Sequence, residues 1–179
     1  MEEYELIDRL IEGDNNAIEK ILERYKGPLF AFILRMISNH ADAEDIFQET
    51  WIRVIRYIRN FRRESKFSTW LFQIALNLCR DAERKKKRWF FVPIDDYKDS
   101  LSCEPDIDPV RTLKAQQVQK IVSELPVKMR EVVVLRYFHD LKDHEISEIV
   151  NCPVGTVKSR FYRASKIIRT KWERLNRGK

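Results

Sequence analysis

The chain has 179 residues, which suits one or two small domains. Its 34 lysines and arginines exceed its 28 aspartates and glutamates, and the resulting formal net charge of +6 favours a polyanionic partner. Only 4 glycines and 6 prolines leave few turns and argue against a many-stranded β fold, while three widely spaced cysteines without a C-x-x-C pair argue against a disulfide framework or a standard zinc site. The first residues lack the pattern of a signal peptide, and no apolar run reaches the ~18 residues of a membrane span, so we expect a cytoplasmic protein without a metal ion or other cofactor.

The first half of the chain carries apolar residues at helical spacing. Short helices are predicted over residues 6–11, 18–25 and 29–37, with Gly27-Pro28 interrupting the last two. A longer helix is expected from about residue 42 to 59. After residues 60–66 another helix follows, which ends in the basic run 84–88. Residues 1–90 are therefore predicted to form an all-helical domain.

The composition changes abruptly after this domain. Residues 93–109 contain six acidic residues and three prolines, and Lys98 is their single lysine. This composition predicts an extended acidic linker, which we place at residues 91–112.

The remainder, residues 113–179, is again expected to be helical. Helices are predicted over 113–125, 132–137 and 144–150, and a last one starts at Pro153 after an Asn151-Cys152 turn. Two helices joined by a tight turn, the second of them basic, form the pattern of a helix-turn-helix. The predicted fold class is all-α, with two small helical domains joined by an extended acidic linker.

The last helix has one apolar and one basic side. Val157, Phe161, Ala164 and Ile168 fall on one face, and the opposite side carries Lys158, Ser159, Tyr162, Arg163 and Lys166. Lysine and arginine reach phosphates or guanine acceptors, and serine and tyrosine can contact base edges, so this side suits a DNA groove. A solvated basic face on a surface helix is the alternative interpretation.

Four motifs, in order along nearly the whole chain, resemble the sigma factors of RNA polymerase, in particular the extracytoplasmic-function (group IV) subfamily of the sigma-70 family. The motifs are DAEDIFQETWIRV, FSTWLFQIALNLCRDAERKKKR, SELPVKMREVVVLRYF and EIVNCPVGTVKSRFYRAS. The resemblance implies an alternative sigma factor without catalytic activity of its own. It also implies that residues 1–90 are sigma domain 2, that residues 113–179 are sigma domain 4, and that the linker threads towards the polymerase cleft.

The resemblance implies three binding surfaces. Core RNA polymerase, through its beta-prime and beta subunits, is the first partner, and the matching residues on the helix over 42–59 are Asp45, Gln48, Glu49 and Ile52. Single-stranded minus-10 DNA matches Asn60, Phe61, Arg62, Arg63, Lys66, Phe67, Arg80, Arg84, Lys85, Lys86, Lys87 and Arg88. Duplex minus-35 DNA matches Thr156, Lys158, Ser159, Arg160, Tyr162, Arg163 and Lys166.

Single-stranded DNA favours a basic groove with aromatic platforms. Phe61, Phe67 and Trp70 have the residue type for stacking on bases. Core packing is the alternative interpretation for all three, and Trp70 fits the core better. The resemblance also implies a monomer controlled by an anti-sigma factor. Two positions depart from the family pattern. Lys142 stands where a serine or threonine usually caps a helix, so Asp140 or Asp143 is expected to cap it instead. Ser147 replaces a usual alanine and brings a hydroxyl group that needs a hydrogen-bond partner.

Two other functions compete with this interpretation. An ordinary helix-turn-helix repressor or activator would bind duplex DNA unaided as a symmetric dimer. A nuclease would use Glu44, Asp45 and Glu49 with a metal ion, but such a site needs ligands from elsewhere in the chain. The linker acids are compatible either with mimicry of nucleic acid or with a solvated tether.

Overall fold

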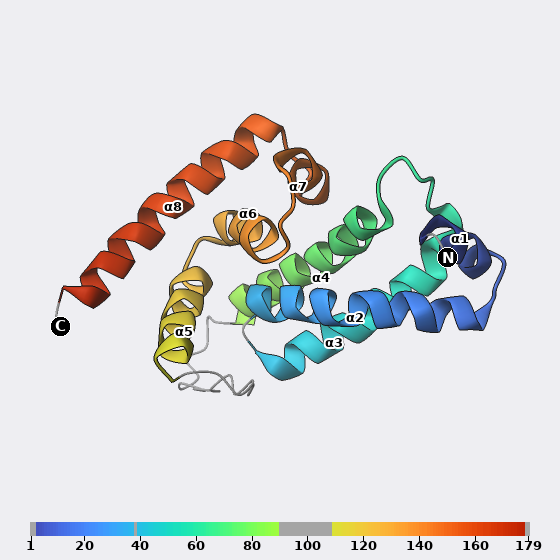
Figure 1. Ribbon diagram of the computed structural model, residues 1–179, viewed down its shortest axis with the longest axis horizontal. Helices are drawn as coiled ribbons and strands as arrows, with labels where there is room; N and C mark the ends of the chain where they lie inside the picture. Colours follow the sequence, from blue (N-terminus) through green and yellow to red (C-terminus); the bar gives the residue numbers. More distant parts are fainter. Residues whose placement is uncertain (1–2, 38, 90–108, 178–179) are drawn as a thin grey trace.

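The structure is a computed structural model that describes residues 3–37, 39–89 and 109–177. All of its regular elements within these ranges are helices, so the predicted all-α class is confirmed (Figure 1). They are α1 (Glu3–Ile11), α2 (Asn15–Ile37), α3 (His40–Tyr57), the 3-10 turn η1 (Ile58–Asn60), α4 (Phe67–Trp89), α5 (Pro109–Ser123), α6 (Val127–Phe138), α7 (Asp143–Val150) and α8 (Val154–Asn176). Residues 90–108 lie outside the described residues, and they include most of the acidic linker predicted at residues 91–112. Helix α5 begins at Pro109, inside the stretch that we assigned to this linker.

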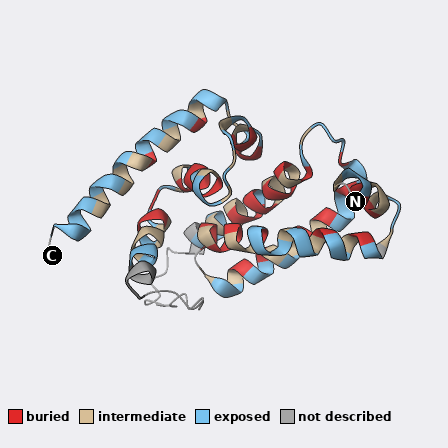
Figure 2. Ribbon diagram, in the orientation of Figure 1, coloured by how far each residue is buried: buried red, intermediate tan, exposed pale blue. Residues whose placement is uncertain are grey.

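Helices α1 to α4 pack around one apolar core (Figure 2). α2 lies at its centre and contacts α1, α3 and α4, and its Leu29, Phe32, Ile33 and Met36 have no exposed surface. The N-terminus of α3 is capped by Asn39, whose side-chain oxygen accepts a hydrogen bond of 2.9 Å from the Asp42 N–H.

The predicted break at Gly27-Pro28 is wrong, because α2 runs through both residues without interruption. Gly27 and Pro28 lie on the exposed side of the helix, where water can solvate the Arg24 carbonyl that proline leaves without an N–H donor. The residues before and after them, such as Ile21 and Leu29, share one buried face. Tertiary burial along this face therefore outweighs the local cost of the proline.

The second half of the chain, α5 to α8, packs directly against the first. α7 contacts α4, and α6 contacts α2, so the buried residues of both halves form one continuous cluster. At the centre of this contact the His139 ring lies 4.9 Å from that of Phe72 and 5.7 Å from that of Phe32. In the same region the Arg130 guanidinium donates to the Met36 carbonyl at 2.6 Å. The relative position of the two halves is therefore held by apolar, aromatic and charged contacts.

Candidate nucleic-acid interface

Helices α7 and α8 form the expected helix-turn-helix. Asn151 ends α7 in the left-handed conformation (φ 53°), which asparagine tolerates better than most residues. The Cys152 N–H then donates to the Ser147 carbonyl at 3.1 Å, and the Ser147 hydroxyl donates to the Cys152 carbonyl at 2.7 Å. The hydroxyl that departs from the family pattern thus finds its partner within the turn and stabilises it.

The start of α7 differs from the expectation, because neither Asp140 nor Asp143 caps it. Asp140 has a left-handed backbone (φ 50°), and Asp143 forms an ion pair of 3.0 Å with Arg136. Instead, the Glu145 carboxylate reaches back and accepts a hydrogen bond of 2.9 Å from the Lys142 N–H. This is the glutamate half of a capping box, which satisfies one of the free N–H groups of a helix start.

The outer face of α8 presents the polar residues that the sequence assigned to duplex DNA. Lys158, Ser159, Tyr162, Arg163 and Lys166 are all exposed, and Tyr162 keeps 61% of its surface. The Lys166 ammonium lies 4.8 Å from the Tyr162 ring centre, and Thr156 and Arg160 are half-buried towards the sides of the helix. Val157 and Ala164, on the opposite face, are buried. The structure therefore places the predicted groove-facing residues on one exposed surface.

The loop between η1 and α4 contains the first part of the set assigned to single-stranded DNA. Asn60, at the end of η1, and the loop residues Arg62, Arg63 and Lys66 are exposed, and Arg63 has a left-handed backbone (φ 59°). Its guanidinium forms an ion pair with Asp8 of α1. The loop is thus tied to the N-terminal helix, a contact that sequence reasoning did not reveal.

The aromatic residues of this loop do not form open stacking platforms. Phe61 and Phe67 are 8% and 1% exposed, and both pack against Trp70. Phe67 also lies 5.5 Å from the Tyr25 ring, which joins the start of α4 to α2. Of the two interpretations of the phenylalanines, stacking on bases and core packing, their burial therefore favours core packing.

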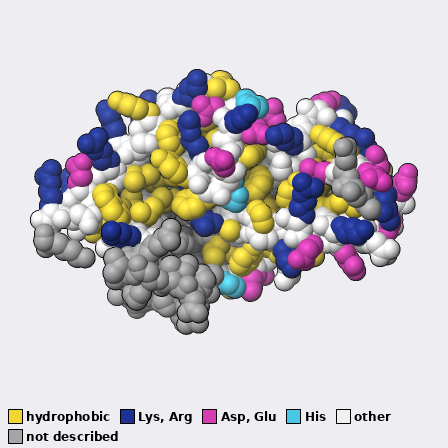
Figure 3. Space-filling model, in the orientation of Figure 1, with side chains coloured by type: hydrophobic (Ala, Val, Ile, Leu, Met, Phe, Trp, Pro, Cys, Tyr) yellow, Lys and Arg dark blue, Asp and Glu magenta, His cyan; other side chains and the backbone are white. Residues whose placement is uncertain are grey.

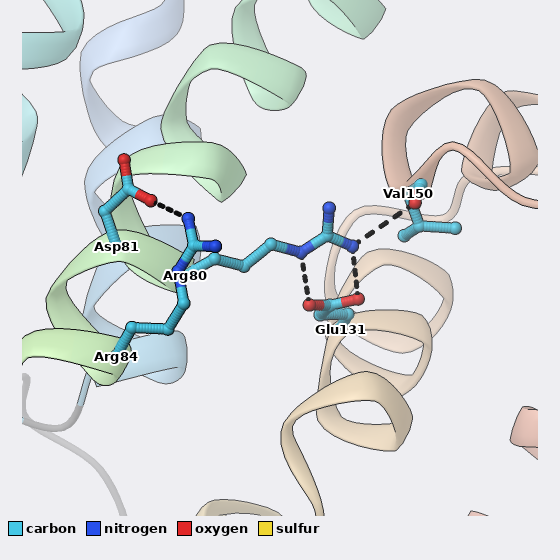
Figure 4. Close-up of polar contacts among 5 residues, drawn as sticks. All are labelled: Arg80, Asp81, Arg84, Glu131 and Val150. Carbon is cyan, nitrogen blue, oxygen red and sulfur yellow. Dashed lines mark hydrogen bonds and ion pairs between the residues drawn. The ribbon is translucent and has the colours of Figure 1, made fainter. Parts of the chain in front are cut away.

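The basic residues of α4 have different environments. Lys85 is exposed, Lys86 forms an ion pair of 2.6 Å with Asp42, and Arg84 pairs with Asp81. Lys87 and Arg88 belong to α4, but their side chains lie outside the described residues. Arg80 is the exception, because it points away from Arg84 towards the second half of the chain, where it binds Glu131 (Figure 4).

The acidic stripe of α3, defined as Asp45, Gln48, Glu49 and Ile52, faces solvent. Asp45, Gln48 and Ile52 are exposed, and the half-buried Glu49 accepts a hydrogen bond of 2.8 Å from Arg53. Beside it, a groove of about 1000 Å³ runs between α3 and α4, and its lining includes Asp45 and Glu49 on one side and Arg84, Lys85 and Lys86 on the other. The surface offers charges of both signs to a partner.

Sequence reasoning missed an apolar groove on the second half. The groove has a volume of about 460 Å³ and is lined by Val118, Val122, Val133, Tyr137, Phe138, Ser165, Ile168, Arg169 and Trp172. Tyr137 keeps 70% of its surface and Phe138 40%, and hydrophobic side chains gather between α6 and α8 on the face drawn in Figure 3. Ile168 and Trp172, four residues apart, extend the apolar side of α8. This extended apolar side was the feature of the sequence that could have predicted the groove. An apolar side of a partner would fit there.

The described residues hold no group of three or more histidine, cysteine, aspartate or glutamate side chains placed to bind a metal ion. No helix in these same ranges is long and apolar enough to cross a membrane. Burial raises the pKa of the Cys79 thiol well above its ordinary value, so this side chain remains a neutral part of the core.

Comparison with known proteins agrees with this geometry. Residues 21–89 match the family described as Sigma-70 region 2, and residues 115–168 match Sigma-70, region 4. The chain is 37% identical to the ECF RNA polymerase sigma factor SigW of Bacillus subtilis, over 91% of this chain and 92% of that protein. It is 31% identical to the ECF RNA polymerase sigma-E factor of Haemophilus influenzae, over 95% of each chain.

Two solved structures have a similar fold. One is CnrH in complex with the cytosolic domain of CnrY, with a TM-score of 0.72 and 20% identity over 94% of this chain and 95% of that one. The other is the sigma factor RpoE of Bartonella quintana in complex with the anti-sigma factor NepR, with a TM-score of 0.72 and 24% identity over 87% of this chain and 96% of that one. Both likenesses extend over the two halves of the chain.

Proposed function

The chain belongs to the sigma-70 family of RNA polymerase sigma factors, in its extracytoplasmic-function group, and we propose from this which of its surfaces contacts each partner during promoter recognition. As a member of this group it is an alternative sigma factor, a specificity subunit that binds core RNA polymerase and directs promoter-specific transcription initiation. Residues 1–90 would serve as sigma domain 2, residues 113–179 as sigma domain 4, and residues 91–112 as their linker. The chemistry of transcription would belong to the core enzyme, so this chain would have no catalytic residue and would act in the cytoplasm.

The observation that carries the assignment is the helix-turn-helix with its exposed polar face on α8. We propose that Lys158, Ser159, Tyr162 and Arg163 read the minus-35 duplex, because recognition helices place such side chains at base edges in the major groove. Thr156, Arg160 and Lys166 lie beside or beyond these four and would contact phosphates or help to orient the helix.

The minus-10 strand would lie along the loop after η1 and the basic side of α4. Asn60, Arg62 and Lys85 are exposed and available to a strand, and Arg63, Lys66, Arg80, Arg84 and Lys86 would first have to exchange a carboxylate for a phosphate. Because Phe61 and Phe67 are buried, they would contribute by shaping the loop and not by stacking on bases. This surface is therefore basic but largely paired within the chain.

Core polymerase would contact both halves. The acidic stripe of α3 is exposed and supports docking of the beta-prime subunit, since an acidic, partly apolar stripe on a basic protein suits a complementary partner. The apolar groove between α5, α6 and α8 supports a contact with the beta subunit. Because two solved proteins of the same fold were captured with CnrY and with the anti-sigma factor NepR, we also propose that an anti-sigma factor controls this chain.

A mobility-shift assay with core polymerase tests the proposal. A promoter fragment selected by run-off transcription across the source genome should form a sequence-specific complex only when both the chain and core polymerase are present. The monomeric chain alone should shift it weakly. Tight, sequence-specific binding by a dimer without polymerase would contradict the proposal and favour an ordinary helix-turn-helix regulator.

A further inference from the structure

Arg80 of α4, assigned to single-stranded DNA, is occupied by a carboxylate from the other half of the chain. Its Nε and one terminal nitrogen each donate to a different oxygen of Glu131 on α6, both at 2.7 Å, and the same terminal nitrogen donates to the Val150 carbonyl at 3.3 Å (Figure 4). This two-point geometry is the one by which arginine binds carboxylates and phosphates alike. Glu131 therefore satisfies Arg80 in the way that a phosphate of a DNA strand would.

A second pair repeats the arrangement at the loop. The Lys66 ammonium contacts a Glu145 oxygen of α7 at 2.6 Å, while the other oxygen of the same carboxylate holds the N–H of Lys142 at the start of α7. Lys66 lowers the pKa of Glu145, which keeps this carboxylate charged. Two cations of the first half thus bind two anions of the second, 51 and 79 residues further along the chain.

The burial of the acids protects the pairs from exchange. The Glu131 side chain is only 1% exposed and that of Glu145 is 11% exposed. Arg80 itself is 28% exposed, but two of its nitrogens donate to Glu131, so a nucleic-acid strand cannot take the place of this carboxylate while α6 and α7 remain against α4. Around the pairs, Arg130 donates to the Met36 carbonyl, and the His139, Phe32 and Phe72 rings pack together. Release of the two Arg80 nitrogens that donate to Glu131 therefore requires the two halves to separate.

We propose that Glu131 and Glu145 act as phosphate mimics that hold the free chain closed, so that a DNA strand and the second half compete for Arg80 and Lys66. This inference rests on the proposed function, because it takes Arg80 and Lys66 as contacts of the minus-10 strand. A buried ion pair contributes little net stability once the dehydration of both charges is counted. Separation of the halves rehydrates all four groups, so the closed state can yield to a partner that holds the halves apart. In the closed state the chain therefore binds non-specific nucleic acid weakly, despite its net charge of +6.

The test measures compaction and strand binding of the full-length chain. Glu131→Gln keeps the shape of the side chain but removes the charge, and we expect its radius of gyration, measured by small-angle X-ray scattering, to rise above that of the wild type. We also expect it to bind a 20-nucleotide single-stranded DNA of mixed sequence more tightly. The slope of log affinity against log salt concentration should steepen by about 0.7, the value for one additional phosphate contact on a single strand.

Glu124→Gln is the matched control, because it removes the same charge from the same half, where Glu124 pairs with Lys171 of α8. It should leave compaction and the salt slope as in the wild type. Glu145→Gln, which frees the largely exposed Lys66, should steepen the slope with a smaller effect on compaction. If circular dichroism shows that Glu131→Gln does not fold, the comparison of Glu145→Gln with Glu124→Gln decides the question on the same slope.

Equal compaction and equal salt slopes in the three variants and the wild type would overturn the proposal. Expansion without tighter strand binding would also overturn it, because the carboxylates would then hold the halves together without standing in for phosphates. Promoter-directed transcription by the wild-type chain with core polymerase is measured separately. Its success alongside unchanged slopes would refute the closed state alone, whereas its failure would refute the proposed function.

Discussion

Glutamates of this chain take different roles according to their exposure. Glu131 is almost completely buried and is held by Arg80, whereas Glu49 lies at the surface in a pair with Arg53 on its own helix. Removal of one partner from a buried pair leaves an uncompensated charge, but a surface pair within one helix contributes only about 0.3–0.5 kcal/mol. Substitutions at the α3 surface therefore report on partner binding and not on folding.

Charge reversal of the acidic stripe should abolish polymerase binding. We expect Asp45→Lys/Glu49→Lys to lose measurable affinity for core polymerase in a pull-down or fluorescence titration, because both side chains face solvent where a partner would dock. The helix content and the thermal midpoint should remain close to those of the wild type. Glu19→Lys/Glu23→Lys makes the same change in charge on exposed positions of α2 and should bind normally. Unchanged affinity of the α3 variant would remove the stripe from the polymerase interface.

Arg163 lies on the exposed face of α8 and should contribute to sequence readout. Arg163→Ala is expected to weaken holoenzyme binding to a minus-35-containing promoter by about 1–3 kcal/mol and to relax base preference at one position, as for loss of a two-point base contact. Arg169→Ala removes an equally cationic residue from the same helix, at a position that pairs with Glu173, and should not alter base preference. The measurement is promoter binding across single-base substitutions. An equal loss at every sequence would identify Arg163 as a phosphate contact.

At the scale of elements, α2 tolerates a proline because its exposed side faces water. Pro28→Ala should stabilise the chain by about 1–2 kcal/mol, because alanine restores an N–H donor for the Arg24 carbonyl and removes the proline ring from the helix interior. This net gain already includes an opposing contribution, because proline lowers the conformational entropy of the unfolded chain and alanine does not. Urea unfolding at pH 7 measures the difference. Gly27→Ala is the companion variant: its added methyl group meets nothing within 4 Å, and a gain of about 1 kcal/mol is expected. A loss of stability in Pro28→Ala would show that the proline is needed for the packing of α2.

Apolar periodicity predicted the helices well, because each buries a stripe that the sequence displays directly. The same periodicity, with the Asn151-Cys152 turn, predicted the helix-turn-helix and its polar face. It failed at Gly27-Pro28, where local breaking signals competed with a stripe that continues on both sides. Local rules also misjudged the start of α7, since the group that satisfies it, Glu145, lies inside the helix and not before it.

The partners of the site residues could not be predicted in the same way. Arg80 and Glu131 are 51 residues apart, and Arg63 and Asp8 lie on elements whose relative position depends on packing of the core. The phenylalanines of the loop have the residue type of stacking platforms, and only the fold reveals that their faces are covered. A charge pattern identifies which residues can bind a strand, but not which of them the chain already occupies.

At the scale of the whole molecule, the contact between the halves combines charge with aromatic packing. His139, at the end of α6, lies between Phe32 of α2 and Phe72 of α4 and thus joins both halves. Its burial, aided by the positive charge of Arg35, lowers the pKa of its imidazole to about 4. The folded chain therefore keeps this ring neutral over the range in which an unfolded histidine takes up a proton.

This difference in pKa predicts how stability depends on pH. Above about pH 6.5 the ring is neutral in both the folded and the unfolded chain and contributes no pH dependence. As the pH falls from 6.5 towards 4, only the unfolded chain binds the proton. The free energy of unfolding therefore decreases over this range, by at most about 3 kcal/mol. His139→Phe keeps an aromatic ring against Phe32 and Phe72 but cannot bind a proton, and urea unfolding between pH 7.5 and 4.5 should show a shallower decline than in the wild type. His144→Gln removes an exposed histidine of α7 and should decline as the wild type does. Parallel curves for all three proteins would mean that His139 gains its proton in the folded chain as readily as in the unfolded one, and that the contact between the halves opens around it.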